Sequence, residues 1–565
     1  MKLLYKKLIL GFAFAGVVAT SCSDEDYVDA NTNPDILNEV PPENQFLSAT
    51  ISLHSQDFEA FYDTYRRIMP WMQYVTPQNG NGASFTSNID NFSQRYGRLY
   101  TGIGDALVDM EKLVEKLPEE DQPKYVHMLS IARILKAYYT FYVSDIYGSI
   151  PYSEAWQARY GGTMLPKYDD QQTLFNTLDQ EIEQSVTALN TAQSITQVSL
   201  GNYDQYYKGD VKSWVRAGNA LRLKIAMRLI KRDASKTQTI AQEVLSQAAD
   251  NLMSSNSQGW VFKGTAGFTS GGNWNPDLLY STKPLVDFMW NTNDPRIDAF
   301  FSPNGYSQAN INALIADGQL PAGTVEASRR YFGGFTSPDD SKAAINKKYY
   351  TPRTVEISGS DVQVDTLSLI QRRLFQPSFD EGNGIGDGLV YLPIITYAEF
   401  CFMRAELAAR SITSEDAETF YNAGVTASIM WYNQIAVDGE LSNYTALGGS
   451  EISDYLSEPA VAFDNAKALD QISSQAFLNF YKQPAEGWGL WKRNGMPNAT
   501  TSLVLPDLKS NGATLPIPRR APLLLLSQAS ANYVNQKAAY DAMAQDAGFG
   551  AGPTDAFGRV WWDEQ

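Results

Sequence analysis

Five long amphipathic stretches follow one another between residues 96 and 251, and they constrain the fold more than any other feature of the sequence. In the first, from Tyr96 to Leu117, apolar residues recur with a period near 3.6, and Pro118 ends the pattern. The others cover residues 122–146, 169–189, 211–231 and 237–251. Consecutive helices of this length predict stacked helix–turn–helix pairs of the tetratricopeptide kind, although the repeat signature itself is weak.

Residues 256–390 interrupt the helical pattern. Glycine, asparagine, proline and aromatic residues cluster there, as in TSGGNWNPDLLY and SRRYFGGFTSPDD. Helical periodicity returns after Pro393. We therefore expect a mainly α fold with long loops and a few short strands. Its single body, residues 46–565, would divide into a helical repeat half (46–255), the loop-rich insert and a helical C-terminal half (391–565).

The N-terminal segment has the layout of a bacterial export signal. Lysines precede an apolar run from Leu8 to Ala19, which is shorter than the roughly 20 residues that span a bilayer. Residues 1–21 are thus predicted to be a signal peptide. Cys22 stands where a lipoprotein carries its lipid, and residues 22–45 would form a tether. The alternative is an ordinary secretory signal with an incidental cysteine.

Charge and composition exclude several classes of function. The formal net charge of −18 argues against a nucleic-acid partner, because phosphate binding needs a basic face. The sequence has only two histidines, His54 and His127, so zinc sites and Ser-His-Asp triads are not expected. We predict no metal and no cofactor. Cys401 lies in an apolar helical pattern and is expected in the core.

The C-terminal part contains residues that we expect to fasten the body together. The terminal stretch VWWD is apolar and should dock on the rest of the protein. Arg493, Arg519 and Arg520 should pair with acids inside it.

Motifs spread along the whole length carry a family resemblance. In chain order they are NTNPDILNEVPPENQFLSA, SDIYGSIPYSEAW, NDPRI, YLPIITYAEFCFMRAELAAR, YNAGVTASIMWY, EGWGLWKRNGMP, PRRAP and VWWD. With these motifs in this order, the chain resembles the SusD/RagB family of Bacteroidetes outer-membrane lipoproteins, in particular its second subfamily.

The resemblance implies a fold, a location and a role. The fold is an α-superhelical body with four tetratricopeptide-like units and long loops. The protein would be anchored in the outer membrane through palmitate on Cys22, and Asp24, Glu25 and Asp26 resemble the signal for surface exposure. It would capture a glycan and deliver it to a SusC-like TonB-dependent transporter. An oligopeptide ligand, as in a RagB-type protein, is the alternative.

Ligand contacts are expected from aromatic residues in loops. Sugar rings stack on aromatic faces, and amide and carboxylate groups bond their hydroxyls. Binding residues also concentrate in loops on rigid scaffolds. For each residue the alternative is burial in the core. The predicted ligand-binding residues are Trp71, Gln73, Tyr74, Trp274, Asn275, Tyr331 and Phe335.

Two other classes of protein compete with a binder. A surface glycoside hydrolase needs two carboxylates at a set separation, and no local motif singles out such a pair among the 63 acids. A purely structural surface protein is the third class. We predict a binding protein with no catalytic residues.

Overall fold

The computed structural model describes residues 40–77, 92, 94–276, 279–379, 386–442 and 444–564. The predicted signal peptide, Cys22 and most of the tether lie outside the described residues. No helix in the described part combines the length and the apolar character that a membrane span needs.

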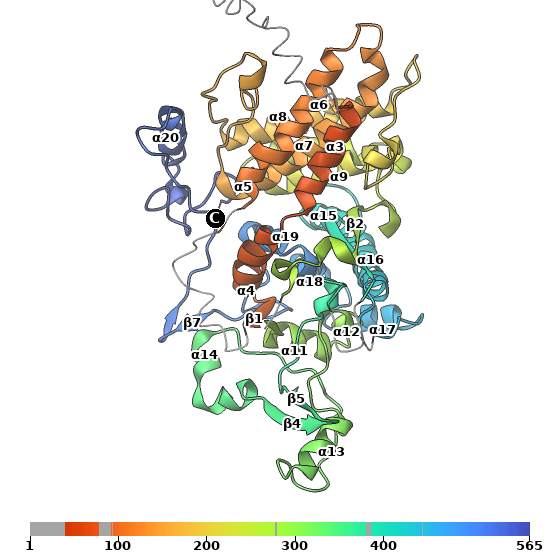
Figure 1. Cartoon of the computed structure of the whole chain (residues 1–565), viewed down its shortest axis with the longest axis vertical. Helices are drawn as coiled ribbons and strands as arrows, with labels where there is room; N and C mark the ends of the chain where they lie inside the picture. Colours follow the sequence, from red (N-terminus) through yellow and green to blue (C-terminus); the bar gives the residue numbers. More distant parts are fainter. Residues whose placement is uncertain are drawn as a thin grey trace, which may run out of the picture.

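Paired helices form the upper layer of the molecule (Figure 1). Helix α7 packs on α8, α8 on α9 and α9 on α10, while α3 packs on α6. Asp170, Asp210 and Asp233 each accept a hydrogen bond from the N–H three residues later, which begins α8, α9 and α10. The predicted helical-pair fold is confirmed. The layer comprises α3 (Pro42–His54), α6 (Gly104–Glu115), α7 (Val126–Tyr147), α8 (Gln171–Asn190), α9 (Val211–Leu229) and α10 (Ala234–Leu245).

A second set of helices lies below this layer. Helix α15 packs on α16 and α18, and α18 packs on α19. Gly424 of α16 permits the first approach, because a Cβ there would lie 2.8 Å from a ring carbon of Phe402. This set comprises α15 (Tyr397–Ala409), α16 (Ala417–Asp438), α17 (Glu451–Ser457), α18 (Ala468–Asn479) and α19 (Pro484–Asn494).

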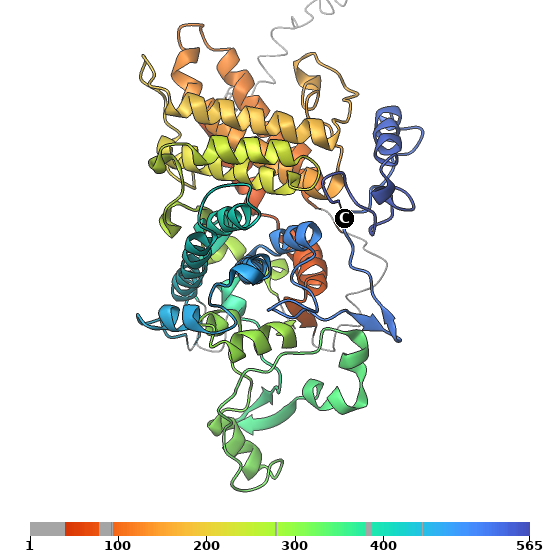
Figure 2. The same cartoon turned by 180° about the vertical axis from the view of Figure 1, so that it is seen from behind.

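Short elements complete the described part. The helices are α4 (Met69–Trp71), α5 (Arg95–Arg98), α11 (Lys283–Asn291), α12 (Ile297–Phe300), α13 (Gln308–Ala316), α14 (Pro338–Lys342) and α20 (Tyr533–Met543), with π-helical segments at Glu59–Ile68 and Leu99–Ile103. Four antiparallel strand pairs are described: β1 (Val75–Pro77) with β3 (Leu279–Ser281), β2 (Trp260–Thr265) with β6 (Leu389–Ile395), β4 (Arg353–Ile357) with β5 (Ser360–Val364), and β7 (Lys509–Ser510) with β8 (Ala513–Thr514). Figure 2 shows α13, β4 and β5 projecting as a separate lobe at the end opposite the upper layer.

Helix α15 joins two hydrophobic cores. Phe400 and Met403 belong to the core of the upper layer, whereas Ala398 and Phe402 belong to the core of the lower helices. Cys401 is fully buried, as predicted. The two halves therefore share one helix, none of whose residues is fully exposed.

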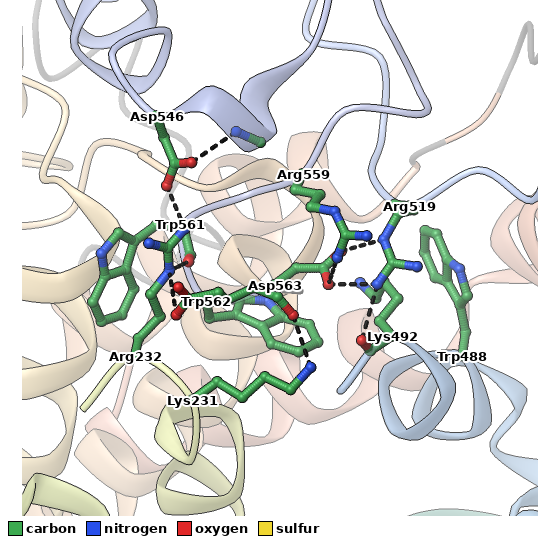
Figure 3. A network of polar contacts seen from close by, with 12 residues as sticks. Lys231, Arg232, Trp488, Lys492, Arg519, Asp546, Arg559, Trp561, Trp562 and Asp563 are labelled. Atoms are coloured by element: carbon green, nitrogen blue, oxygen red, sulfur yellow. Dashed lines mark hydrogen bonds and ion pairs between the residues drawn. The ribbon is translucent and has the colours of Figure 1, made fainter. Parts of the chain in front are cut away.

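The last described residues dock between these parts (Figure 3). Trp562 is 1% exposed, and its Nε1 donates to the carbonyl oxygen of Asp145 at 2.9 Å. Arg519 donates to both carboxylate oxygens of Asp563, at 2.8 and 2.6 Å. The predicted docking of VWWD is confirmed.

The other two arginines behave differently from each other. Arg493 pairs with the buried Glu406, as expected. For Arg520 the expected acid pair is wrong, because its guanidinium donates to the backbone carbonyls of Asp555 and Gly552, at 2.8 and 2.6 Å. Backbone carbonyls thus bond the Nε and Nη2 of this buried cation, while its Nη1 has no hydrogen-bond partner among the described residues.

Candidate functional site

A groove of about 520 Å³ opens between four segments that are distant in the sequence. Helix α11 and Thr292 line it, together with residues 335–340, residues 502–506 and Ala460. We call it the α11 groove. Its lining includes Lys283, Asp287, Asn291, Phe335, Thr336, Asp340, Ser502 and Val504.

The α11 groove offers both apolar and hydrogen-bonding surface. The Phe335 side chain is half-buried in it, and Val504 is 50% exposed. Asn291 and Asp340 are exposed and supply an amide and a carboxylate. An aromatic ring beside such groups suits a ligand with apolar faces and many hydroxyls.

Asp287 sits at one end of the groove and bridges two cations. Its carboxylate pairs with Lys283, one turn earlier on α11, and with Arg329 from the segment after α13. The Asp287 side chain is 30% exposed, so these pairs remain in contact with solvent. They hold the segments in place while leaving the charges accessible.

Gln73 supports the groove from behind. It is 3% exposed and has a φ of 55°, in the left-handed region. Its Nε2 donates to the Pro506 carbonyl at 2.9 Å, and its Oε1 accepts from the Thr336 hydroxyl at 2.7 Å. Since Pro506 and Thr336 both line the groove, Gln73 positions two of its walls.

Two predicted aromatic contacts lie in the core instead of in a loop. Trp71 is 1% exposed and packs against Trp488, with ring centroids 5.8 Å apart. Tyr74 is fully buried, stacks on Phe477 at 4.2 Å and donates its hydroxyl to the Phe477 carbonyl. Both rings fasten α4 and the start of β1 to the lower helices, and Trp71 also borders a cavity of about 230 Å³.

The remaining predicted residues are scattered. Tyr331 is 8% exposed, and its hydroxyl donates to Asp298. Trp274 lines a separate cavity of about 170 Å³ that also contains His54. Asn275, the next residue, has a buried Oδ1 without a hydrogen-bond partner among the described residues. Among the seven predicted residues, Gln73 bonds Thr336 next to Phe335, and Gln73 and Trp71 together line a cavity of about 230 Å³.

Sequence reasoning missed most of the groove lining. Lys283 and Asp287 have the i,i+4 spacing of a helical ion pair, which is a recognisable signal. Asn291, Ser502 and Val504 carry no such signal, because only folding brings their segments together.

The described residues contain no group of three or more His, Cys, Asp or Glu side chains that could hold a metal ion. His54 lies in the separate cavity beside Trp274 and not in the α11 groove. Burial lowers the pKa of His54 to about 3, which keeps its imidazole neutral and hydrogen-bonded to the Tyr206 hydroxyl at 2.7 Å.

The fold defines a class: a scaffold of tetratricopeptide-like helix pairs, on which α11 and loop segments form a groove. The chain belongs to the SusD-like family described as starch-binding and associating with the outer membrane, whose match covers residues 34–522. The predicted family is thereby confirmed.

Solved structures share this fold at low sequence identity. A chitin-binding protein aligns with a TM-score of 0.69 and 20% identity, over 93% of this chain and all of its own. A chitin-binding SusD homologue from Flavobacterium johnsoniae gives 0.62 and 19%, over 93% and 99%. A SusD homologue from Bacteroides fragilis gives 0.63 and 20%, over 92% and 100%. No curated protein matches the sequence.

Proposed function

We propose that this protein captures a glycan at the cell surface and passes it to a SusC-like TonB-dependent transporter. Family membership supports a carbohydrate ligand and an outer-membrane location. Similarity in fold to two chitin-binding proteins is in keeping with this. The observation that carries the proposal is the α11 groove, where Phe335 lies beside amide, hydroxyl and carboxylate groups.

Binding in the groove divides into two contributions. A sugar ring stacks on Phe335 and Val504, which removes apolar surface from water. Asn291, Asp340 and Ser502 bond the hydroxyls and set the orientation. The ligand leaves unchanged, because the protein acts by holding and release and not by turnover. Lipid on Cys22 would keep the body at the membrane.

The test is isothermal calorimetry of the soluble body with chitooligosaccharides, maltooligosaccharides and a peptide panel. We expect binding to an oligosaccharide that Phe335→Ala weakens about tenfold, or about 1.4 kcal/mol. The matched control is Phe557→Ala, since Phe557 is 41% exposed and lies outside the groove lining.

Three results would overturn the proposal. They are binding of peptides alone, release of new reducing ends from a bound glycan, and glycan binding that Phe335→Ala leaves unchanged. The first would favour the RagB-type alternative, the second a hydrolase and the third a different site.

A further inference from the structure

A second and larger hollow lies in the lobe that contains α13, β4 and β5 (Figure 1). Its volume is about 870 Å³, and we call it the lobe cleft. Residues 324–332 and 347–353 supply most of its lining. Leu314, Val355 and Val364 form a small core of their own beneath it, so the walls rest on packed side chains.

The lobe cleft is strongly basic. Five cations line it, namely Arg329, Arg330, Lys347, Lys348 and Arg353, and no acidic side chain is among its described lining residues. This contrasts with the chain as a whole, whose formal charge is −18. A concave surface lined by one sign of charge concentrates the field and attracts ions of the opposite sign.

Neighbouring acids neutralise only part of this charge. Arg329 pairs with Asp287, and Arg330 pairs with Glu326. Lys347 and Lys348 are exposed and form no ion pair with a described residue. Arg353 donates to the Gln319 carbonyl at 2.8 Å, which holds its guanidinium without neutralising it. About three positive charges therefore remain available.

Aromatic rings lie between these cations. Tyr306, Phe332 and Tyr349 line the cleft, and the Arg329 guanidinium sits 5.3 Å from the Phe332 ring centre. Cations set among aromatic faces suit a ligand that is both anionic and ring-shaped.

The lobe cleft and the α11 groove are neighbours. Asp287 of the groove pairs with Arg329 of the cleft. The Phe335 ring of the groove lies 5.8 Å from the Tyr349 ring of the cleft. A polymer held in the groove therefore has a route into the cleft.

We propose that the lobe cleft binds an anionic stretch of a polysaccharide, with carboxylate or sulfate groups on Lys347, Lys348 and Arg353. The choice of a carbohydrate rests on the proposed function, whereas the requirement for negative charge rests on the cleft alone.

The test uses fluorescently labelled polymers and the whole soluble body, followed by anisotropy. Dextran sulfate supplies sulfate esters, and polygalacturonate supplies carboxylates. Uncharged dextran is the control, because it has the same glucan backbone as dextran sulfate. We expect binding to at least one anionic polymer and none to dextran at the same concentration. Raising NaCl from about 50 to about 300 mM should weaken it at least tenfold, since the contacts are exposed to salt.

The decisive variant is Lys347→Gln with Lys348→Gln, which should lower affinity for the anionic polymer at least tenfold. Its control, Lys116→Gln with Lys167→Gln, removes the same charge from exposed lysines elsewhere and should change affinity less than twofold. Circular dichroism and the thermal midpoint should be the same in both variants.

Failure of this inference is distinguishable from failure of the proposed function. If neutral oligosaccharides bind through Phe335 and no anionic polymer binds, the proposal for the lobe cleft is wrong and the proposed function stands. Anionic binding that survives Lys347→Gln with Lys348→Gln would also overturn the proposal for the lobe cleft. Equally tight binding of single-stranded DNA, lost in the same variant, would overturn the choice of a carbohydrate.

Discussion

Two carboxylates in different regions of this protein each bridge two cations. Glu486 pairs with Lys224 and Arg228, both at 2.9 Å, where α9 meets α19. Asp287 pairs with Lys283 and Arg329 at the end of the α11 groove. The Glu486 side chain is 9% exposed and that of Asp287 is 30% exposed. The same arrangement of charges thus fastens the two halves in one place and shapes a binding surface in the other.

The two carboxylates differ in their effect on stability because Glu486 is buried and Asp287 is partly exposed to solvent. Burial alone would raise the pKa of Glu486, but Lys224 and Arg228 outweigh it and hold the pKa well below its usual range. Removing one member of a buried set leaves uncompensated charge, which is strongly destabilising. Exposed pairs are screened and contribute little to stability.

The largest effect is expected from Glu486→Gln. It removes the carboxylate that links Lys224 to Arg228, although Lys224 keeps Glu399 and Arg228 keeps Asp145 as partners. The free energy of unfolding should therefore fall by about 1.5–3 kcal/mol in urea titrations, the range for lost hydrogen bonds to a charged group. Glu115→Gln is the control, because Glu115 pairs with Lys112 on the surface with 60% of its side chain exposed. Equal stability of the two variants would contradict the contrast between the regions.

An intermediate effect concerns a buried cation that lacks a hydrogen-bond acceptor among the described residues. This cation is Lys492, labelled in Figure 3, which lies 4.2 Å from the Trp488 ring centre and 4.7 Å from that of Trp562. Burial lowers its pKa to about 8, below the usual 10.5. The unfolded chain then binds more protons between these values, so stability should rise with pH in that window.

The check is the difference between the wild type and Lys492→Met in urea titrations at pH 8 and pH 9.5. The wild type should gain about 1–2 kcal/mol more than the variant over this interval. A parallel pH dependence in both proteins would show that Lys492 is not the titrating group.

The smallest effect on stability is expected from Asp287→Asn. The unfolding free energy should change by less than about 1 kcal/mol, because the Asp287 pairs are partly solvated. Lys283 in the α11 groove and Arg329 in the lobe cleft would then lose the carboxylate that neutralises them. Affinity for an anionic polymer should therefore rise. A loss of stability as large as that of Glu486→Gln would remove the distinction between the two bridging carboxylates.

The sequence predicted the helices well because their signal is local. The 3.6 period and the aspartates that begin α8, α9 and α10 need no knowledge of the rest of the chain. The SusD-like family was also recognised from motif order. The division of the body at residues 255 and 390 stays a prediction.

The ligand residues were harder to predict because an aromatic side chain has the same local signal in a core and in a binding site. Trp71 and Tyr74 stand next to a polar segment in the sequence, yet folding covers them with Trp488 and Phe477 from more than 400 residues later. The α11 groove has the converse problem, since Asn291, Thr336 and Ser502 meet only in space.

The docking of Trp562 has a consequence for the order of events during biogenesis. Its indole bonds the Asp145 backbone across 417 positions of sequence. A chain delivered from its N-terminus would expose an unfilled apolar site on the helical layer until this indole arrives. Chaperones that shield nascent polypeptides would have to remain engaged almost to the end of delivery.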